Sequence, residues 1–255
     1  MLFGSRMPIS LIPGLTITSR CKAFCPETPK LDSLVILGDL FDMWIGDNRI
    51  LLARHEPLLR ILVGLRKLGK RVYYVKGNHD FLLGRYFRDE VQADIIEDEV
   101  ILEWDGYRFL VSHGDRIDDR DYGYRVLRRI LRNPWADKLI RFIDDEKALR
   151  IGTRLAATAK ATPNDKNLQR LEKTRLAYAV GHMQKNIHAV ILAHTHRKRW
   201  EVIAVGKEQR LYVNPGSWLE ERTFLWYSKG AFQLQQLTGA RRGFCLTSPS
   251  PSIRV

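Results

Sequence analysis

The chain has 255 residues, of which 45% are hydrophobic, and a formal net charge of +13. This length allows one large core, so we expect a single α/β domain with an insertion. The charge indicates an anionic partner, such as nucleic acid, a phosphorylated metabolite or an acidic membrane surface. Three cysteines exclude a disulfide framework and favour a reducing compartment. No apolar run reaches the roughly 18 residues of a membrane-spanning helix.

Two short apolar runs predict buried strands, and polar residues follow each of them. Residues 34–37 lead to Asp39, and residues 71–75 lead to a second polar group. The stretch between them, 51–68, has the apolar spacing of an amphipathic helix, which predicts a crossover helix. The polar group after the second strand consists of Asn78, His79 and Asp80. Because α/β proteins place their sites at the carboxyl ends of strands, both loops are candidate site segments.

The next segments repeat this pattern with histidine. Residues 100–104 and 107–112 flank Asp105-Gly106, which is a strong signal for a two-residue hairpin turn, and the second arm leads to His113. A further apolar strand is predicted over 189–192. It leads to His194 and His196.

The last part of the chain predicts two more hairpins and a tail. The hairpins pair 200–205 with 210–214 and 223–227 with 231–237. Residues 238–255 are rich in Ser, Pro and Arg, so we expect this tail to be disordered.

Five side chains at these strand ends have the chemistry of metal ligands. A carboxylate can bridge two cations, an amide can bind through its oxygen, and histidines bind through ring nitrogens. The candidates are Asp39, Asn78, His113, His194 and His196. Their convergence predicts a metal site that activates water and clamps a phosphoryl group.

Each of these motifs also has a purely structural interpretation. The segment Gly38-Asp39 fits a simple turn, Asp80 fits a helix cap, and an isolated histidine is more often structural than a ligand. The metal hypothesis is favoured because all of them occur at strand ends.

Four segments resemble the successive blocks of the calcineurin-like metallophosphoesterases. They are Gly38-Asp39-Leu40-Phe41-Asp42, Gly77-Asn78-His79-Asp80, Ser112-His113-Gly114-Asp115 and Ala193-His194-Thr195-His196. The resemblance covers residues 34–237. It implies a four-layer α/β/β/α sandwich with a helical lid insertion over 116–186, and a centre of two divalent cations, often Mn²⁺.

The resemblance also implies a role for each candidate. One cation would be held by Asp39, Asn78, His113 and His194. The other would share Asp39, which bridges the two ions, and take His196. His79, supported by Asp80, would lie over the phosphate and stabilise transition-state charge or protonate the leaving group.

Within this superfamily, the chain is most similar to the UDP-2,3-diacylglucosamine hydrolases of lipid A synthesis. The similarity is carried by residues 37–47 and by 113–122, which precede a basic helix. It implies cleavage of the substrate's pyrophosphate bond to UMP and lipid X by a cytoplasmic protein held peripherally at the inner membrane. The implied partners are a nucleotide-linked lipid and an anionic membrane surface. Candidate substrate contacts are Asp119, Tyr122, Asn164 and Lys166.

Two features of the sequence leave other functions open. Many of these hydrolases carry Arg where this chain has His79, so a phosphodiesterase or nuclease of the same superfamily is the alternative enzyme. The insertion is predicted to be helical over 122–150, with apolar and basic residues that fit a lid on an anionic membrane. An ordinary amphipathic helix packed on the sheet is the alternative.

Residues 214–218 resemble a loop common in the superfamily, to which we assign no chemistry.

The first 33 residues depart from the family pattern. The family opens with a strand ending in Asp-x-His, but here no Asp precedes Asp32 and no His precedes His55. We therefore expect this first strand to be absent. One cation would keep only Asp39 and His196, too few for tight binding. A wrong start site or frameshift is the favoured explanation; a single-metal enzyme and a binding relative without turnover are the others.

Overall fold

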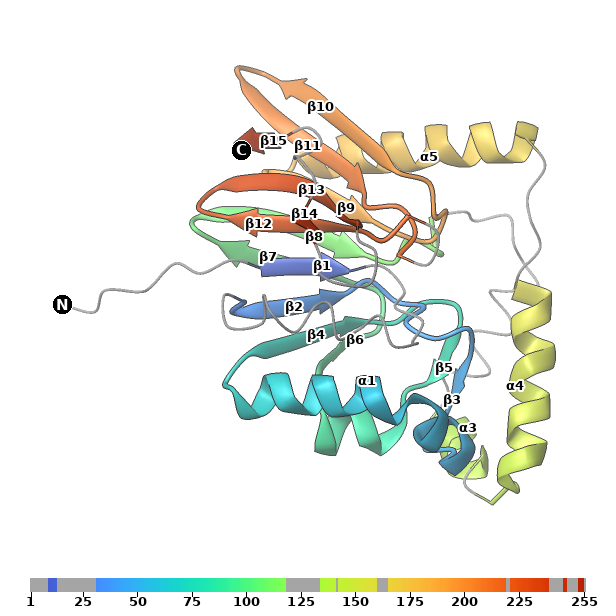
Figure 1. The fold of residues 1–255 in the computed structure, drawn as a ribbon. Coiled ribbons are helices and arrows are strands. Elements are labelled where there is room, and N and C mark those ends of the chain that lie inside the picture. Colours follow the sequence, from blue (N-terminus) through green and yellow to red (C-terminus); the bar gives the residue numbers. More distant parts are fainter. Residues whose placement is uncertain are drawn as a thin grey trace.

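The computed structural model describes residues 9–12, 31–117, 134–140, 142–159, 165–218, 221–238, 245–246 and 252–254. Their strands form two large sheets and one small sheet (Figure 1). The first large sheet has the order β14 (Cys245–Leu246), β13 (Ala231–Thr238), β12 (Thr223–Ser228), β1 (Ile9–Ile12), β2 (Ser33–Ile36), β4 (Arg71–Val75) and β6 (Asp94–Ile96), with β15 (Ser252–Arg254) paired to β13. The second has the order β10 (Arg199–Val205), β11 (Glu208–Asn214), β9 (Ala189–Leu192), β8 (Tyr107–Ser112) and β7 (Glu99–Trp104). The small sheet pairs β3 (Trp44–Ile45) with β5 (Asp80–Leu82).

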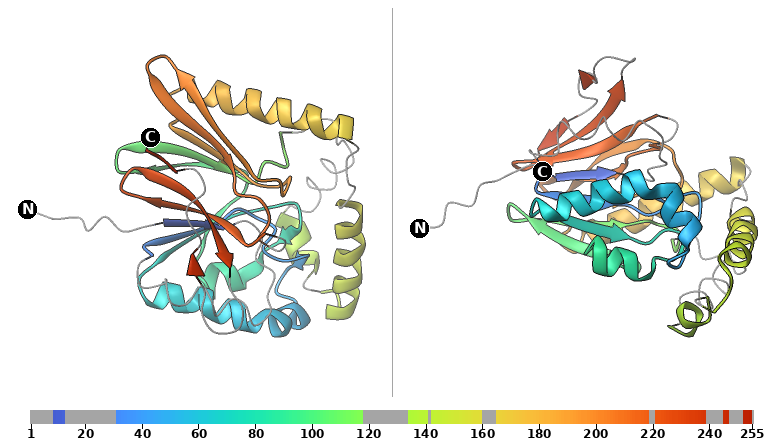
Figure 2. Two further views of the ribbon diagram at one scale, coloured as in Figure 1. Left: turned by 45° about the horizontal axis from the view of Figure 1, so that its top comes forward. Right: turned by 60° about the horizontal axis from the view of Figure 1, so that its bottom comes forward.

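The two large sheets pack face to face, and a helix covers the outer face of each (Figures 1 and 2). Between the sheets, Val35 and Val75 of the first meet Phe109, Val111 and Ile191 of the second in one buried cluster. Helix α1 (Arg49–Lys67) packs on the first sheet, and α5 (Asp165–Met183) packs on the second through a separate cluster. The layer order is α/β/β/α, so the predicted fold class is confirmed.

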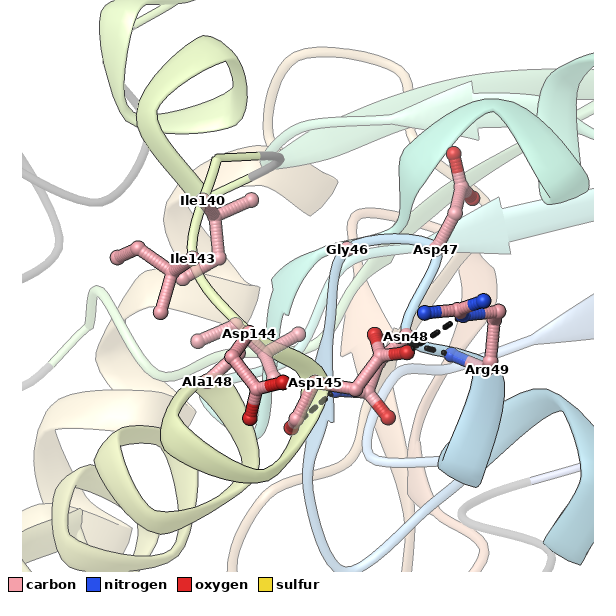
Figure 3. A pocket seen from close by; sticks show the side chains of 10 residues that line it. Gly46, Asp47, Asn48, Arg49, Ile140, Ile143, Asp144, Asp145 and Ala148 are labelled. Atoms are coloured by element: carbon pink, nitrogen blue, oxygen red, sulfur yellow. Dashed lines mark hydrogen bonds and ion pairs between the residues drawn. The ribbon is translucent and has the colours of Figure 1, made fainter.

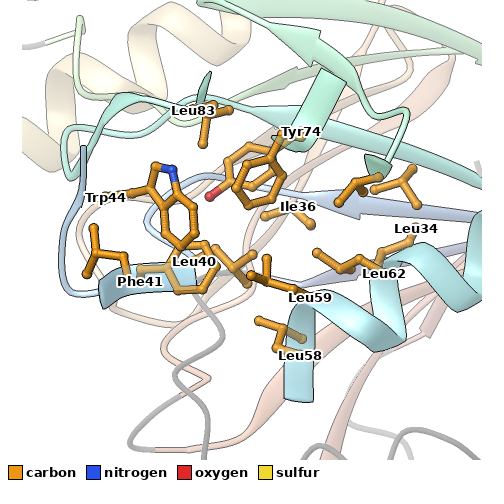
Figure 4. Packing of buried hydrophobic residues seen from close by; sticks show 14 of the residues in the cluster. Leu34, Ile36, Leu40, Phe41, Trp44, Leu58, Leu59, Leu62, Tyr74 and Leu83 are labelled. Carbon is orange, nitrogen blue, oxygen red and sulfur yellow. The ribbon is translucent and has the colours of Figure 1, made fainter. Parts of the chain in front are cut away.

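The contact between α1 and the first sheet shows how sequence periodicity becomes packing. Three leucines of α1, Leu58, Leu59 and Leu62, lie against Ile36 and Tyr74 of the sheet (Figure 4). Each is 2% exposed or less, and burying one leucine contributes about 1.5–3 kcal/mol. The helix begins one residue after Asn48, whose side-chain oxygen accepts hydrogen bonds from two backbone N–H groups of the first turn. This layer fixes the loops that follow β2 and β4.

The expectation that the first strand is absent is wrong. Strand β1 lies parallel to β2, with Ile12 opposite Ile36, and antiparallel to β12. We expected no strand because the Asp-x-His ligands are missing. Strand pairing does not need these side chains, since it requires only an extended backbone segment between two strands. The sequence still contains no Asp-x-His there, since Pro13, Gly14 and Leu15 follow β1. Residues 1–8 and 13–30 lie outside the described residues.

The C-terminal tail also differs from its prediction. Two short strands, β14 and β15, add to the edge of the first sheet through β13. Ile253 of β15 is 9% exposed and joins the core between the sheets. A few apolar residues in a tail rich in Ser and Pro are therefore enough for pairing with an available edge strand. The three predicted hairpins are confirmed, and the residues at the Asp105-Gly106 turn have φ of 53° and 81°.

The insertion contains three described helices, α3 (Pro134–Ile140), α4 (Asp145–Ala159) and α5. A continuous helix over 122–150 is therefore wrong, because the chain turns between α3 and α4. At this turn the Asp144 side chain accepts hydrogen bonds from the N–H groups of Glu146 and Lys147, which caps α4. None of the described helices is long and apolar enough to cross a membrane. Residues 118–133, 141 and 160–164 of the insertion lie outside the described part.

Helix α4 is fixed to the core at its N-terminus. The Arg49 guanidinium lies 2.7 Å from the Asp145 carboxylate, and the Asn48 side-chain amide donates to the Asp145 carbonyl at 2.7 Å. Further along, Gly152 packs so closely that an added Cβ would lie 2.5 Å from Met43 Sδ. The insertion thus rests on β3 and the start of α1.

Candidate metal centre

The candidate ligands meet where the carboxyl ends of four strands come together. Strands β2 and β4 are parallel neighbours in the first sheet, and β8 and β9 are parallel neighbours in the second. The residues that follow these strands are, in this order, Asp39, Asn78, His113 and His194. Since the sheets face each other, each contributes two ligands to one point. The structure therefore brings together four of the five predicted metal ligands.

Two glycine loops make this close approach possible. Gly38 and Asp39 both have positive φ, of 80° and 51°, so the chain turns sharply after β2. An added Cβ at Gly77 would lie 2.1 Å from Asp39 Oδ1, and one at Gly38 would lie 2.6 Å from the Gly77 nitrogen. The loops after β2 and β4 are in backbone contact, which explains the glycine before each ligand.

The ligand atoms lie within contact distance of one another. His113 Nε2 is 2.9 Å from Asn78 Oδ1 and 3.3 Å from Asp39 Oδ2. His194 Nδ1 is 2.9 Å from the same Asn78 oxygen and 3.2 Å from His113 Nε2. All these atoms carry lone pairs when the histidines are neutral. Such a set can hold a divalent cation of the Mn²⁺ or Zn²⁺ type.

A hydrogen bond fixes which nitrogen of His113 faces the cluster. Its Nδ1 lies 2.7 Å from the Leu37 carbonyl oxygen, which can only accept, so Nδ1 carries the proton. The other nitrogen, Nε2, then presents its lone pair to the cluster, as metal-binding histidines do when their second nitrogen donates to a carbonyl. This geometry fits a metal ligand better than a structural histidine.

The Asp39 carboxylate favours positive charge beside it, at His113 but not at His194. Burial lowers the pKa of His113, but the Asp39 carboxylate outweighs it and raises the pKa to about 9. Burial would raise the pKa of Asp39, yet His113 and His79 hold it below its usual range. Burial and the adjacent His113 lower the pKa of His194 to about 3, so its imidazole stays neutral, as a metal ligand requires.

Asp80, which was predicted to support His79, is hydrogen-bonded to the two ligand loops and to a tyrosine. Asp80 Oδ2 accepts hydrogen bonds from the backbone N–H groups of Asp39 and Gly77, at 2.8 and 2.9 Å, and Oδ1 accepts from the Tyr74 hydroxyl at 2.9 Å. Burial and the neighbouring Asp39 raise the pKa of Asp80 to about 6. Asp80 is buried and joins the two ligand loops through the backbone of Asp39 and Gly77.

His79 is held from two other directions. Its ring Nδ1 lies 2.7 Å from the Asp42 carbonyl oxygen, and its backbone N–H donates to Asp39 Oδ1 at 2.9 Å. The residue as a whole is 9% exposed. Because the carbonyl only accepts, Nδ1 carries a proton and Nε2 is the atom that binds or releases one.

The structure describes only part of the remaining predicted site residues. His196 is exposed, has φ of 56°, and is not part of the group formed by Asp39, His113 and His194 among the described residues. Lys166 lies in the first turn of α5, where only the backbone is described. Three of the predicted substrate contacts, Asp119, Tyr122 and Asn164, lie outside the described residues.

Two residues of the site were missed by the sequence analysis. The Asn214 side-chain amide donates to the Ala193 carbonyl at 3.1 Å and to Thr195 Oγ1 at 2.9 Å, which holds the loop of His194. Its segment was noticed but assigned no chemistry. The second is Arg175, whose side chain donates to the backbone carbonyls of Gly114, next to His113, and Ala193, next to His194. Nothing in the sequence distinguishes it from other charged residues of a surface helix.

A pocket of about 280 Å³ lies between the insertion and the core (Figure 3). Its core wall includes Ile45 at the end of β3 and Gly46 after it, and its opposite wall includes Ile140 and Ala148 of the insertion. Strand β3 pairs with β5, where Trp44 lies opposite Asp80. Strand β3 therefore borders the pocket and pairs with the strand that begins at Asp80, next to the ligand loops. The pocket walls carry both apolar and charged side chains.

A fold of this layer order with Asp, Asn and His at four strand ends defines a metallophosphoesterase. The chain belongs to the calcineurin-like phosphoesterase family, whose family model matches residues 16–198, and the family implies a hydrolase that binds divalent metal.

Two curated relatives are similar over most of their length. The chain is 30% identical over 215 residues to the UDP-2,3-diacylglucosamine hydrolase of Aeromonas salmonicida (strain A449), covering 83% of each chain. It is 30% identical over 198 residues to the enzyme of that name from Shigella dysenteriae serotype 1 (strain Sd197), covering 76% of this chain and 81% of the relative. Among solved structures, Vacuolar Protein Sorting 29 from Cryptosporidium parvum aligns over 98% of this chain and 99% of its own, with 14% identity and a TM-score of 0.46. The family assignment rests on the family model and the two sequence relatives.

Proposed function

We propose that the chain hydrolyses the pyrophosphate bond of UDP-2,3-diacylglucosamine, giving UMP and 2,3-diacylglucosamine 1-phosphate (lipid X). The observation that carries the proposal is the convergence of Asp39, Asn78, His113 and His194 within contact distance at the end of four strands. The substrate is taken from the names of the relatives, which share 30% identity with this chain.

The metal centre follows from the donor set. Asp39 Oδ2, Asn78 Oδ1, His113 Nε2 and His194 Nδ1 would hold one divalent cation, for which Mn²⁺ is our candidate. A second cation would share Asp39 and take His196, and so has fewer protein ligands. When bound, such cations polarise a phosphoryl oxygen and lower the pKa of a bound water.

His79 is our candidate for the proton-transferring group. Because its Nδ1–H is held by the Asp42 carbonyl, the ring cannot turn freely, and Nε2 is the nitrogen available to the leaving group. A histidine in this orientation can stabilise the charge that develops on the leaving oxygen or protonate it. Asp80 would act indirectly, by fixing Asp39 and Gly77.

The insertion supports a lipid substrate and a peripheral position at the inner membrane. Three large apolar side chains of α3 and the turn after it are exposed: Trp135 by 72%, Leu139 by 65% and Phe142 by 88%. The Lys138 ammonium lies 4.8 Å from the centre of the Trp135 ring. Apolar side chains beside lysine on a protein of net charge +13 suit the cytoplasmic face of an anionic bilayer. Asp119, Tyr122, Asn164 and Lys166 remain the proposed contacts to the substrate.

Two observations each favour another candidate function. His79 stands where many UDP-2,3-diacylglucosamine hydrolases carry Arg, and the chain has no Asp-x-His at β1. A phosphodiesterase or nuclease with broader specificity would fit the histidine, and a binding relative without turnover would fit the missing ligands. Substrate comparison and metal content separate these from the leading proposal.

The test is a comparison of substrates with purified protein and Mn²⁺. Release of UMP from UDP-2,3-diacylglucosamine should exceed hydrolysis of bis(p-nitrophenyl) phosphate and of single-stranded DNA at equal concentration. His113→Ala should abolish it, whereas His188→Ala, which changes a half-buried histidine at the amino end of β9, should not. A preference for the aryl diester or DNA would instead select the second candidate, and absence of turnover with bound metal would select a binding protein.

A further inference from the structure

Helix α5 carries an arginine that is fully buried behind the metal centre. Arg175 is 0% exposed, although a charged side chain is costly to bury without strong hydrogen bonds. Its Nη1 donates to the Gly114 carbonyl at 3.2 Å, and its Nη2 donates to the Ala193 carbonyl at 2.6 Å. Both acceptors are backbone oxygens of segments far from α5 in the sequence, so the contact is a tertiary one.

These two carbonyls belong to the neighbours of the two histidine ligands. Gly114 follows His113, and Ala193 precedes His194. Strands β8 and β9 pair up to Ser112 and Leu192, and the Ala193 N–H still donates to the His113 carbonyl at 3.1 Å. Beyond this point no rung of the strand ladder joins them among the described residues. The Arg175 guanidinium forms the next connection between the backbones of these two segments.

The shape of the guanidinium suits this position. Its planar fork offers two N–H groups in fixed relation, whereas an ammonium is a compact donor that cannot reproduce the fork. Gly114 has φ of +93°, and a Cβ there would lie 2.7 Å from Arg175 Nη1. The glycine therefore leaves the space that the arginine fills.

We propose that Arg175 is a positioning residue that sets the distance between the His113 and His194 ligands by joining the backbones of their two loops. The proposal rests on the metal centre described under the proposed function. It adds that α5 takes part in metal binding, although α5 supplies no ligand. Because α5 begins at Asp165, directly after the part of the insertion that carries proposed substrate contacts, the same helix connects that region to the centre.

Arg66 provides a matched control for the test. It also donates from Nη1 to a backbone carbonyl, that of Lys70, at 2.9 Å, and both arginines have a buried Nε that lacks a partner in the described structure. Arg66 lies at the C-terminal end of α1, just before β4 begins, whereas the ligands follow the end of β4. Replacing Arg66 therefore perturbs a similar side chain at the opposite end of the sheet.

The experiment is calorimetric titration of metal-free protein with Mn²⁺, with circular dichroism as a check of folding. Arg175→Met should weaken Mn²⁺ binding by about 10–100-fold, the usual effect of losing a group that orients a metal ligand. Arg175→Lys should recover part of this loss, and Arg66→Met should bind as the wild type does. Equal affinity of wild type and Arg175→Met would overturn the inference while leaving the proposed function intact. If Arg175→Met does not fold, Arg175→Lys decides, because wild-type affinity in that variant also overturns the inference. If the wild type itself binds no Mn²⁺, the proposed function fails, and the inference fails with it.

Discussion

His113 Nε2 and His194 Nδ1 lie 3.2 Å apart, and each is 2.9 Å from the same oxygen of Asn78. The two histidines follow parallel strands of one sheet, and Asn78 follows a strand of the other. Since the Nδ1 proton of His113 is engaged by the Leu37 carbonyl, its Nε2 can complete this arrangement only by binding a second proton or a cation. The arrangement forms only where the carboxyl ends of the two sheets meet.

Replacing His113 by Ala should remove metal binding while leaving the fold. The change deletes a ligand and also frees the buried Asp39 carboxylate from its positive neighbour. We expect Mn²⁺ affinity to fall by more than about 100-fold, beyond the effect of losing a supporting group. Calorimetric titration measures this. Unchanged binding in the variant would remove His113 from the ligand set.

Gly77 should tolerate no side chain. A Cβ would lie 2.1 Å from Asp39 Oδ1, so Gly77→Ala must push the two ligand loops apart and should abolish Mn²⁺ binding. Gly181→Ala is the control, because a Cβ at this position of α5 meets nothing within 4 Å. That change should raise stability by about 0.5–1 kcal/mol, since alanine favours a helix over glycine. Thermal melts together with metal titration distinguish the two outcomes, and normal binding by Gly77→Ala would contradict the loop contact.

Asp80 should matter for stability as well as for metal binding. In Asp80→Asn, one acceptor oxygen becomes an amide donor. If the amide faces Asp39 and Gly77, their N–H groups lose their acceptor, and if it faces Tyr74, the hydroxyl proton loses its acceptor. The unsatisfied buried group should cost about 1–3 kcal/mol of unfolding free energy. Denaturant titration of the metal-free protein measures the loss. A variant as stable as the wild type would mean that Asp80 does not hold these loops.

The exposed residues of the insertion should determine membrane binding but not chemistry. Changing Trp135 and Phe142 together to Ser should reduce sedimentation with anionic phospholipid vesicles by about tenfold or more, given the apolar area removed. Hydrolysis of a water-soluble phosphodiester should stay unchanged. Val202→Ser, at another exposed apolar position 45% accessible to solvent, is the control and should not alter vesicle binding. Equal sedimentation of all three proteins would argue against a lipid-facing insertion.

Much of the fold could be predicted because local signals agree with the tertiary structure. The apolar runs at 34–37, 71–75 and 189–192 became β2, β4 and β9 within one residue of their predicted ends. Strands β2 and β9 are buried throughout, and β4 is exposed only at Arg71, so an apolar run is a reliable signal for them. The break between α3 and α4 could not be seen, because apolar residues continue through it with helical spacing. Only the cap by Asp144 marks it.

The candidate site was predictable where its chemistry lies in the side chain itself. Asp39, Asn78, His113 and His194 stand out as polar residues after apolar strands, and they meet in the structure. Arg175 and Asn214 could not be found in this way, because their partners are backbone carbonyls that have no sequence signature. The contacts of Asp80 could not be predicted for a similar reason, since its donors include the backbone N–H groups of Asp39 and Gly77.

The most direct test of the central claim is a crystal grown with Mn²⁺ and measured for anomalous scattering. The account predicts one strong peak at bonding distance from Asp39 Oδ2, Asn78 Oδ1, His113 Nε2 and His194 Nδ1. Crystals with these four side chains in place but no anomalous peak among them, at saturating Mn²⁺, would contradict it.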